Sequence, residues 1–187
     1  MNELTLAELS RLLMNVIRIG TVIEVDLVMT VARVQTGGLQ TDWIRWGADR
    51  AGEAVTWWAP SVGEQVVILA PGGALENAVI AFSLYSDYAL PPDNASKTEV
   101  TRYPDGARKS YDPAQGLLSL LAMKAGLIDM SGTLTLNVGR LVINAGETVI
   151  NGEVVQGGGD MSSNGVVVHT HKHGGVKAGS DTSGGPQ

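Results

Sequence analysis

A seven-residue repeat in the distal half of this 187-residue chain most constrains what it can fold into. Asn137, Asn144 and Asn151 stand in register, and each follows an apolar residue. β-Branched residues, Thr, Asn and Gly oppose a helix and favour strand-turn-strand units. The repeat therefore predicts a β-helix or a similar stack, although a seven-residue period is also typical of coiled coils.

The distal half lacks the large side chains of a monomeric core. All four Trp lie between Trp43 and Trp58, and no aromatic residue follows Tyr111. Short strands of small apolar residues bury little in one chain, whereas several chains wound around a shared axis would bury the same faces. We therefore expect a mainly β protein with a globular N-terminal half and an intertwined β-helical shaft over residues 99–168.

Composition excludes several classes of protein. The chain has no Cys, which excludes disulfides and thiolate metal sites. Its net charge of −6 gives no electrostatic reason to bind nucleic acid. No apolar segment is long enough to cross a bilayer as a helix, and the start Met1-Asn2-Glu3 lacks the cations of a secretory signal. We therefore expect synthesis in the cytoplasm.

Apolar residues near the N-terminus follow the i, i+3, i+4, i+7, i+8 pattern of one helical face: Leu9, Leu12, Leu13, Val16 and Ile17. Thr5 and Glu8 have capping-box spacing, and Gly20 is suited to end the element. The pattern predicts a short amphipathic helix over about residues 5–18, within an N-terminal segment 1–20. We expect its apolar stripe to pack on its own domain, and contact with a neighbouring chain is the alternative.

Short β runs separated by Gly and Pro fill residues 21–89 and predict a small closed barrel of the oligonucleotide/oligosaccharide-binding (OB) type. After a Val-rich stretch up to about residue 36, the expected runs are Asp42–Trp46, Val55–Ala59, Glu64–Ala70 and Ala78–Tyr85. Residues 90–98 contain Pro91-Pro92 and read as an extended, unpaired linker.

An OB barrel also suggests a binding module for oligonucleotide or glycan, in which tryptophans act as stacking platforms. The candidates are Trp43, Trp46, Trp57 and Trp58. Arg45 and Arg50 are the only cations close to them in sequence, so a basic groove is missing. We prefer tryptophans that supply barrel core and subunit contact.

All three histidines lie within five residues, His169-Thr170-His171-Lys172-His173. In an extended strand, His169 and His171 would point to the same side. Two imidazoles are too few for a closed metal site, but three copies of the pair would supply six. The plainer alternative is an exposed polar patch. We expect His173 to face solvent, because Gly174-Gly175 is suited to end the strand.

Several motifs strongly resemble the baseplate assembly protein V family, the central spikes of contractile phage tails and R-type pyocins. They are Arg33–Gly38, Thr41-Asp42-Trp43, Trp57–Gln65, Tyr103–Gly106, and Ser162–Gly165 leading to His169-Thr170-His171. The resemblance covers essentially the whole chain in the order of the family. The chain looks shorter in its repeat region than the longer phage members.

The resemblance implies a homotrimer. Its OB domain would dock to baseplate hub and tail tube proteins, and its intertwined β-helix would narrow to a tip that pierces the outer membrane of a Gram-negative cell. The tip, residues 169–187, would hold one structural iron ion, octahedrally ligated by His169 and His171 of each chain. Some spikes of this family also hold calcium and chloride, to which no residues are assigned here.

An enzyme is the competing class of function. Non-haem iron oxygenases need two His and one carboxylate with open positions, but the nearest following carboxylate is Asp181. No Ser-His-Asp arrangement, phosphate-binding loop or paired carboxylates stand out. We therefore expect no catalysis, and we expect residues 174–187 to fold back and cap the open trimer end. An infective phage and a headless pyocin need the same part, so the sequence leaves that choice open.

Overall fold

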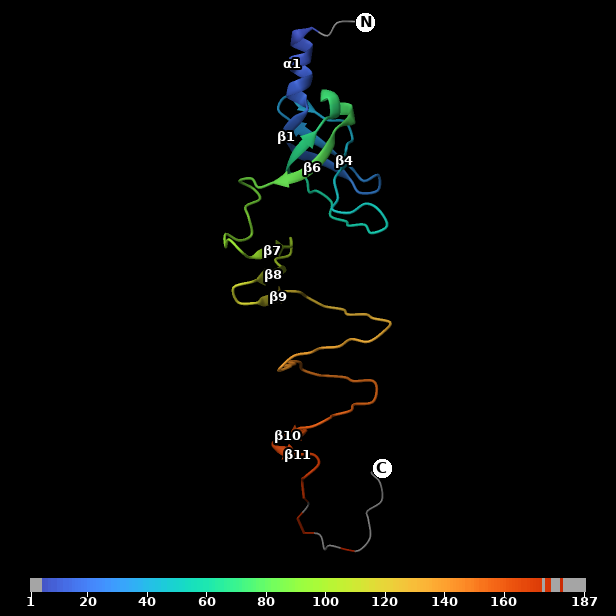
Figure 1. The fold of residues 1–187 in the computed structure, drawn as a ribbon, viewed down its shortest axis with the longest axis vertical. Helices are drawn as coiled ribbons and strands as arrows, with labels where there is room; N and C mark the ends of the chain where they lie inside the picture. Colours follow the sequence, from blue (N-terminus) through green and yellow to red (C-terminus); the bar gives the residue numbers. More distant parts are fainter. Residues whose placement is uncertain (1–4, 173, 176–178, 180–187) are drawn as a thin grey trace. The chain divides into compact units, whose positions relative to one another are not determined.

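The structure is a computed structural model that describes residues 5–172, 174–175 and 179 (Figure 1). It divides into two units, Met1–Ile128 and Asp129–Gln187, which are described separately below. Over these residues the chain is mainly β with one short α-helix, as the sequence predicts.

The helix α1 spans Leu6–Asn15 and begins at the predicted cap, where the backbone N–H of Glu8 donates to Thr5 Oγ1 at 3.3 Å. The expected continuation to residue 18 is wrong. Strand β1 already begins at Ile17, and the carbonyl of Val16 accepts a hydrogen bond from the N–H of Ala70 at 2.9 Å. Pairing with a distant strand therefore ends the helix well before Gly20.

Only part of the expected apolar stripe of α1 packs on its own domain. Leu12 and Val16 are half-buried, and the 3₁₀ turn η1 (Pro71–Gly73) lies against the helix. Leu9 and Leu13 are exposed. The helix thus keeps an apolar face that its own domain does not cover.

A six-stranded sheet follows α1, with the strand order β3-β2-β1-β5-β6-β4. Its strands are β1 (Ile17–Asp26), β2 (Val31–Thr36), β3 (Leu39–Gln40), β4 (Arg45–Trp46), β5 (Gln65–Leu69) and β6 (Val79–Leu84), and η2 (Leu75–Asn77) precedes β6. A bridge between Ala32 and Ile44 joins β2 to the segment entering β4, so the sheet curls back on itself as a barrel does.

The core of the barrel consists of side chains that alternate along the strands toward its interior. Its members are Val22, Ala32, Val34, Ile44, Val66, Ile68, Ala70, Ala78 and Ile80. The residues are small or β-branched, and Trp46 is the one tryptophan packed against them. The other three tryptophans are exposed, so the expectation that they supply barrel core holds for Trp46 alone.

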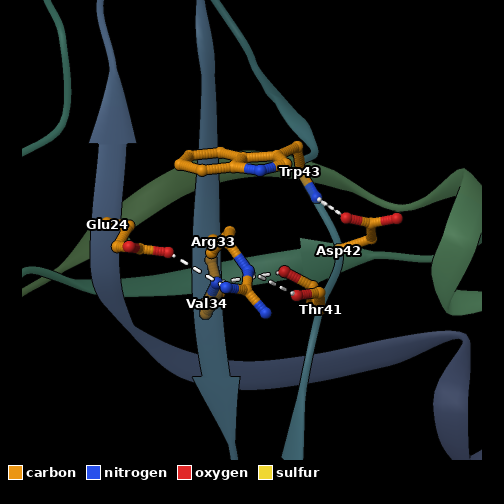
Figure 2. A network of polar contacts seen from close by, with 6 residues as sticks. All are labelled: Glu24, Arg33, Val34, Thr41, Asp42 and Trp43. Atoms are coloured by element: carbon orange, nitrogen blue, oxygen red, sulfur yellow. Dashed lines mark hydrogen bonds and ion pairs between the residues drawn. The ribbon is translucent and has the colours of Figure 1, made fainter.

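Polar side chains cover the outer surface where β1 meets β2 (Figure 2). Arg33 pairs with Glu24 at 3.0 Å, and its guanidinium lies 5.9 Å from the ring centroid of Trp43. Thr41 is buried and closes this part of the barrel, because its Oγ1 accepts the backbone N–H of Val34 at 3.0 Å. Asp42 Oδ1 accepts the N–H of Trp43.

The expected strand over Val55–Ala59 is wrong, because this stretch forms a loop. The N–H of Thr56 donates to the carbonyl of Arg50, and Thr56 Oγ1 accepts the N–H of Arg50. These hydrogen bonds join the two ends of the loop, and its backbone does not pair with the strands of the barrel.

Residues 90–98 form neither helix nor strand, and Asp93 links this stretch to the sheet that follows. Asp93 accepts the backbone N–H groups of Asn94 and Ala95, and its other oxygen lies 2.7 Å from the guanidinium of Arg108. Arg108 opens the middle strand of a second sheet with the order β7-β8-β9, formed by β7 (Glu99–Arg102), β8 (Arg108–Asp112) and β9 (Leu117–Leu121).

Beyond β9 the chain buries almost nothing against itself. Within the described residues 122–161 no strand forms, and every residue from Leu120 to Val166 is exposed. The segment includes the predicted repeat, whose Leu, Ile and Val side chains are between about half and two-thirds exposed. Among the described residues, no helix combines the length and the apolar character that crossing a bilayer requires.

Candidate metal centre

A two-residue turn positions the histidine cluster. Asn164 and Gly165 have φ values of 49° and 80°, the pattern of a type I′ hairpin turn. They join β10 (Ser162–Ser163) to β11 (Val166–Val167), and the N–H of Val168 extends the ladder by donating to the carbonyl of Met161 at 2.8 Å. The Asn-Gly dipeptide thus decides which residues face each other ahead of the histidines.

The histidine pair lies on a turn, not on the extended strand considered from the sequence. The N–H groups of Thr170 and His171 both donate to the carbonyl of Val167, at 3.4 and 3.0 Å. Strand alternation therefore does not relate His169 to His171 in a single chain. His173 lies outside the described residues, as does most of the expected capping tail after it.

Each imidazole has a defined neighbour. His171 Nδ1 lies 2.6 Å from the carbonyl oxygen of Val168. Because a carbonyl only accepts hydrogen bonds, a hydrogen bond at this contact requires the proton to lie on Nδ1. This is the arrangement in which a backbone carbonyl orients a metal-binding histidine.

Asp160 is a neighbour that the sequence reasoning missed. Its Oδ1 lies 3.4 Å from His169 Nε2. The turn at Asn164-Gly165 places residue 163 opposite 166, and counting outward along the ladder places Asp160 opposite His169. That register was a signal in the sequence from which Asp160 could have been found.

One chain alone does not offer a complete metal site. Among the described residues, no group of three or more His, Asp or Glu side chains is arranged to hold an ion. His169 and His171 fit a metal by their donor chemistry, as orientable imidazoles, but only if other copies supply the missing ligands.

The tryptophans considered as stacking platforms mostly contact other rings. Trp46 and Trp57 meet edge to face with centroids 5.7 Å apart, and Trp58 stacks on Tyr103 at 6.3 Å. The one guanidinium near Trp43 belongs to Arg33, whose charge is paired with Glu24. These contacts join the loop carrying Trp57 and Trp58 to the barrel and to the turn after β7.

The barrel and the segment that begins at the hairpin each match a family of known proteins. Residues 18–85 match the family described as the type VI secretion system/phage-baseplate injector OB domain, and residues 165–187 match the GpV apex motif. The spike protein of Escherichia phage P2 is 38% identical over 212 aligned positions that cover both chains completely. The chain belongs to the baseplate assembly protein V family of spike proteins.

Membership of the spike family confirms the resemblance drawn from the sequence motifs, and it confirms the OB domain. The apex motif contains both His169 and His171. The alignment with the phage P2 spike has 212 positions against the 187 residues of this chain, so about 25 positions fall opposite gaps here. That difference agrees with the expectation of a chain shorter than the longer phage members of the family.

Proposed function

We propose that three copies of this chain form the central spike of a contractile phage tail or R-type pyocin, and that the spike punctures the outer membrane of a Gram-negative cell when the tail contracts. Synthesis would occur in the bacterial cytoplasm, followed by assembly with hub and tube proteins at the baseplate. The role is mechanical and involves no catalysis.

The observation that carries this proposal is the continuous exposure of residues 120–166 in a single chain. Ile143, Val149 and Ile150, for example, are each about two-thirds exposed. Burying an aliphatic side chain of this size stabilises by about 1.5–3 kcal/mol, so a segment with many of them is strongly driven to associate. Winding three copies together into the predicted β-helix supplies both the missing burial and the missing backbone partners.

His169 and His171 of the three copies would hold the iron ion expected at the tip, where it would link the chain ends as a structural ion. Asp160 would orient His169, and the carbonyl of Val168 would orient His171. Groups that are hydrogen-bonded to metal ligands orient those ligands in the same way in other metalloproteins. Because only the folded trimer would offer all six nitrogens, binding would stabilise that state.

The proposal is tested with particles whose spike is truncated after Asn164. We expect the shortened chain still to form trimers, since the repeat is retained, but to permeabilise target cells less. Release of a periplasmic marker enzyme after particle contraction measures puncture, and native mass spectrometry measures assembly. Particles with truncated trimers that release the marker at the normal rate would show that the tip does not pierce.

The alternative of an oligonucleotide- or glycan-binding OB module is tested on the same material. Binding of labelled single-stranded DNA and of outer-membrane polysaccharide to the full chain is measured by filter retention. The mechanical role predicts no retention beyond that of an unrelated acidic protein. Tight retention that W57A and W58A abolish would favour the binding module instead.

A further inference from the structure

One half of the barrel exterior is apolar. In β1 the core positions Gly20 and Val22 alternate with Ile17 and Ile19, which therefore point outward. Cross-strand partners share a face, and the register pairs these two residues with β5, which in turn pairs with β6. The same register puts Thr21, Gln65 and Leu84 at one end of the outward-pointing set. Its other members are all apolar and are called the apolar barrel face below: Ile17, Ile19, Val67, Leu69, Val79 and Phe82.

The apolar barrel face is open to solvent in a single chain. Ile17 is 64%, Ile19 56% and Phe82 58% exposed. Val67 is buried although it is not part of the core cluster, and it lies between its cross-strand partners Ile19 and Phe82 on this face. The side chains therefore form a contiguous apolar surface rather than scattered exposed residues, which is typical of an interaction site.

The other half of the barrel exterior carries charged and polar side chains. It carries the Glu24–Arg33 ion pair and the cross-strand pair Gln35–Gln40 (Figure 2 shows the ion pair and the residues around it). A barrel whose exterior is divided in this way is suited to bury one side and leave the other in water. Thr21 and Gln65, the polar residues that point outward beside the apolar barrel face, are uncharged. The absence of cations among these outward-pointing residues disfavours an anionic lipid surface or a nucleic acid as the partner.

We propose that the apolar barrel face turns toward the three-fold axis and packs against the same face of the two other copies. This inference rests on the proposed trimeric spike. Around a three-fold axis, one face of each copy can meet its equivalents while the opposite face stays outside. The buried patch would then have the apolar character of a homo-oligomer interface, and the polar half would face outward.

The chain connection makes a second copy the expected occupant. Residue 84 ends β6 and residue 99 begins β7, so at most about 50 Å of extended chain separates each barrel from the start of the shaft segment. Once three shafts wind together, tethers of this length hold the barrels at an effective concentration on the order of millimolar. Exposed apolar faces at that concentration associate with one another before they meet another protein.

The test uses the absence of native cysteine. Single thiols are introduced by I19C and F82C on the apolar barrel face, and by Q40C on the exposed polar half as the matched control. Maleimide modification rates are measured on the purified full chain and divided by the rates in denaturant. We expect the I19C and F82C thiols to react at least ~10-fold more slowly than the Q40C thiol in the folded trimer, because they are buried between copies.

The outcomes separate this inference from the proposed function. Native mass spectrometry first establishes whether the chain is a trimer. A trimer in which all three thiols react equally fast overturns the barrel contact and leaves the trimeric spike intact. Protection that appears only in assembled baseplates overturns it as well, since a different protein would then cover the face. A monomeric chain overturns the proposed function itself. If I19C does not fold, F82C gives the same readout.

Discussion

At the scale of single residues, the close approach of β1 to β2 depends on Gly20. A Cβ atom added there would lie 2.5 Å from Val34 Cγ1 and 2.6 Å from the carbonyl oxygen of Gln35. Real Cβ contacts are not this short, and one of the two atoms belongs to the backbone of a paired strand. The position therefore needs glycine for space, whereas most glycines of the distal half have open space around them.

This predicts that G20A destabilises the barrel by about 1–3 kcal/mol, the usual cost of overpacking a tight core. G38A is the matched control, because a Cβ there meets no atom within 4 Å. Its expected effect is neutral or slightly stabilising, since alanine restricts the unfolded chain. Urea unfolding followed by tryptophan fluorescence compares the two. Equal stabilities would mean that the strands can separate at no cost.

At the scale of elements, the connection from the barrel to the β7-β8-β9 sheet is held by named contacts. Asp93 caps the amides of Asn94 and Ala95 and pairs with Arg108. Bonds from those backbone amides, and then the Arg108 guanidinium, lower the pKa of the Asp93 carboxyl. Trp58 stacks on Tyr103 beside the same sheet. If the spike transmits force from baseplate to tip as proposed, such contacts would keep this connection from bending.

Replacing Asp93 should loosen this connection. In D93A we expect the amide of Ala95 to exchange hydrogen roughly three- to ten-fold faster at neutral pH, as local opening becomes easier. D87A removes the same charge from an exposed turn just after β6 and should leave that amide unchanged. Hydrogen exchange read by mass spectrometry measures both variants.

The pH dependence of the Asp93 contacts follows from the direction of the pKa shift. Because the folded pKa is lowered, the stabilisation is fully present above the ordinary aspartate value of about 4 and is lost as the pH falls through the lowered value. The stability of this connection should therefore differ between wild type and D93A at pH 7 and become the same near pH 2. A difference that persists in acid would point to side-chain packing rather than charge.

At the scale of the whole molecule, apolar burial and metal binding would make separate contributions to one assembly. Residues 120–166 carry the apolar side chains that three copies would bury, whereas His169 and His171 lie beyond them. Loss of the metal should therefore leave the trimer assembled and lower its resistance to unfolding.

The variant H169A/H171A tests whether trimer assembly is independent of metal binding. We expect iron to fall from about one ion per three chains to near zero, while native mass spectrometry still shows a trimer, and the thermal midpoint should drop because the ion no longer stabilises the native state. T170A is the control between the two ligands and should keep its iron. Iron that remains bound to H169A/H171A would place the site elsewhere.

Local patterns in the sequence determined much of this protein. The capping box at Thr5 and Glu8 predicted where α1 begins, and alternating β-branched runs predicted most barrel strands. The turn at Asn164-Gly165 could also be predicted from the sequence. These features depend on residues adjacent in the chain, whose conformational preferences act over one turn of helix or one hairpin.

Contacts between distant segments decided the rest. The helix ends at Asn15 because the residues that follow it pair with β5, about fifty positions further along the chain. The apolar barrel face emerges only when three strands align their outward residues, although each strand alone reads as an ordinary alternating run. Short-range preference is encoded residue by residue, whereas pairing and burial are properties of the folded arrangement, so only the tertiary structure could supply them.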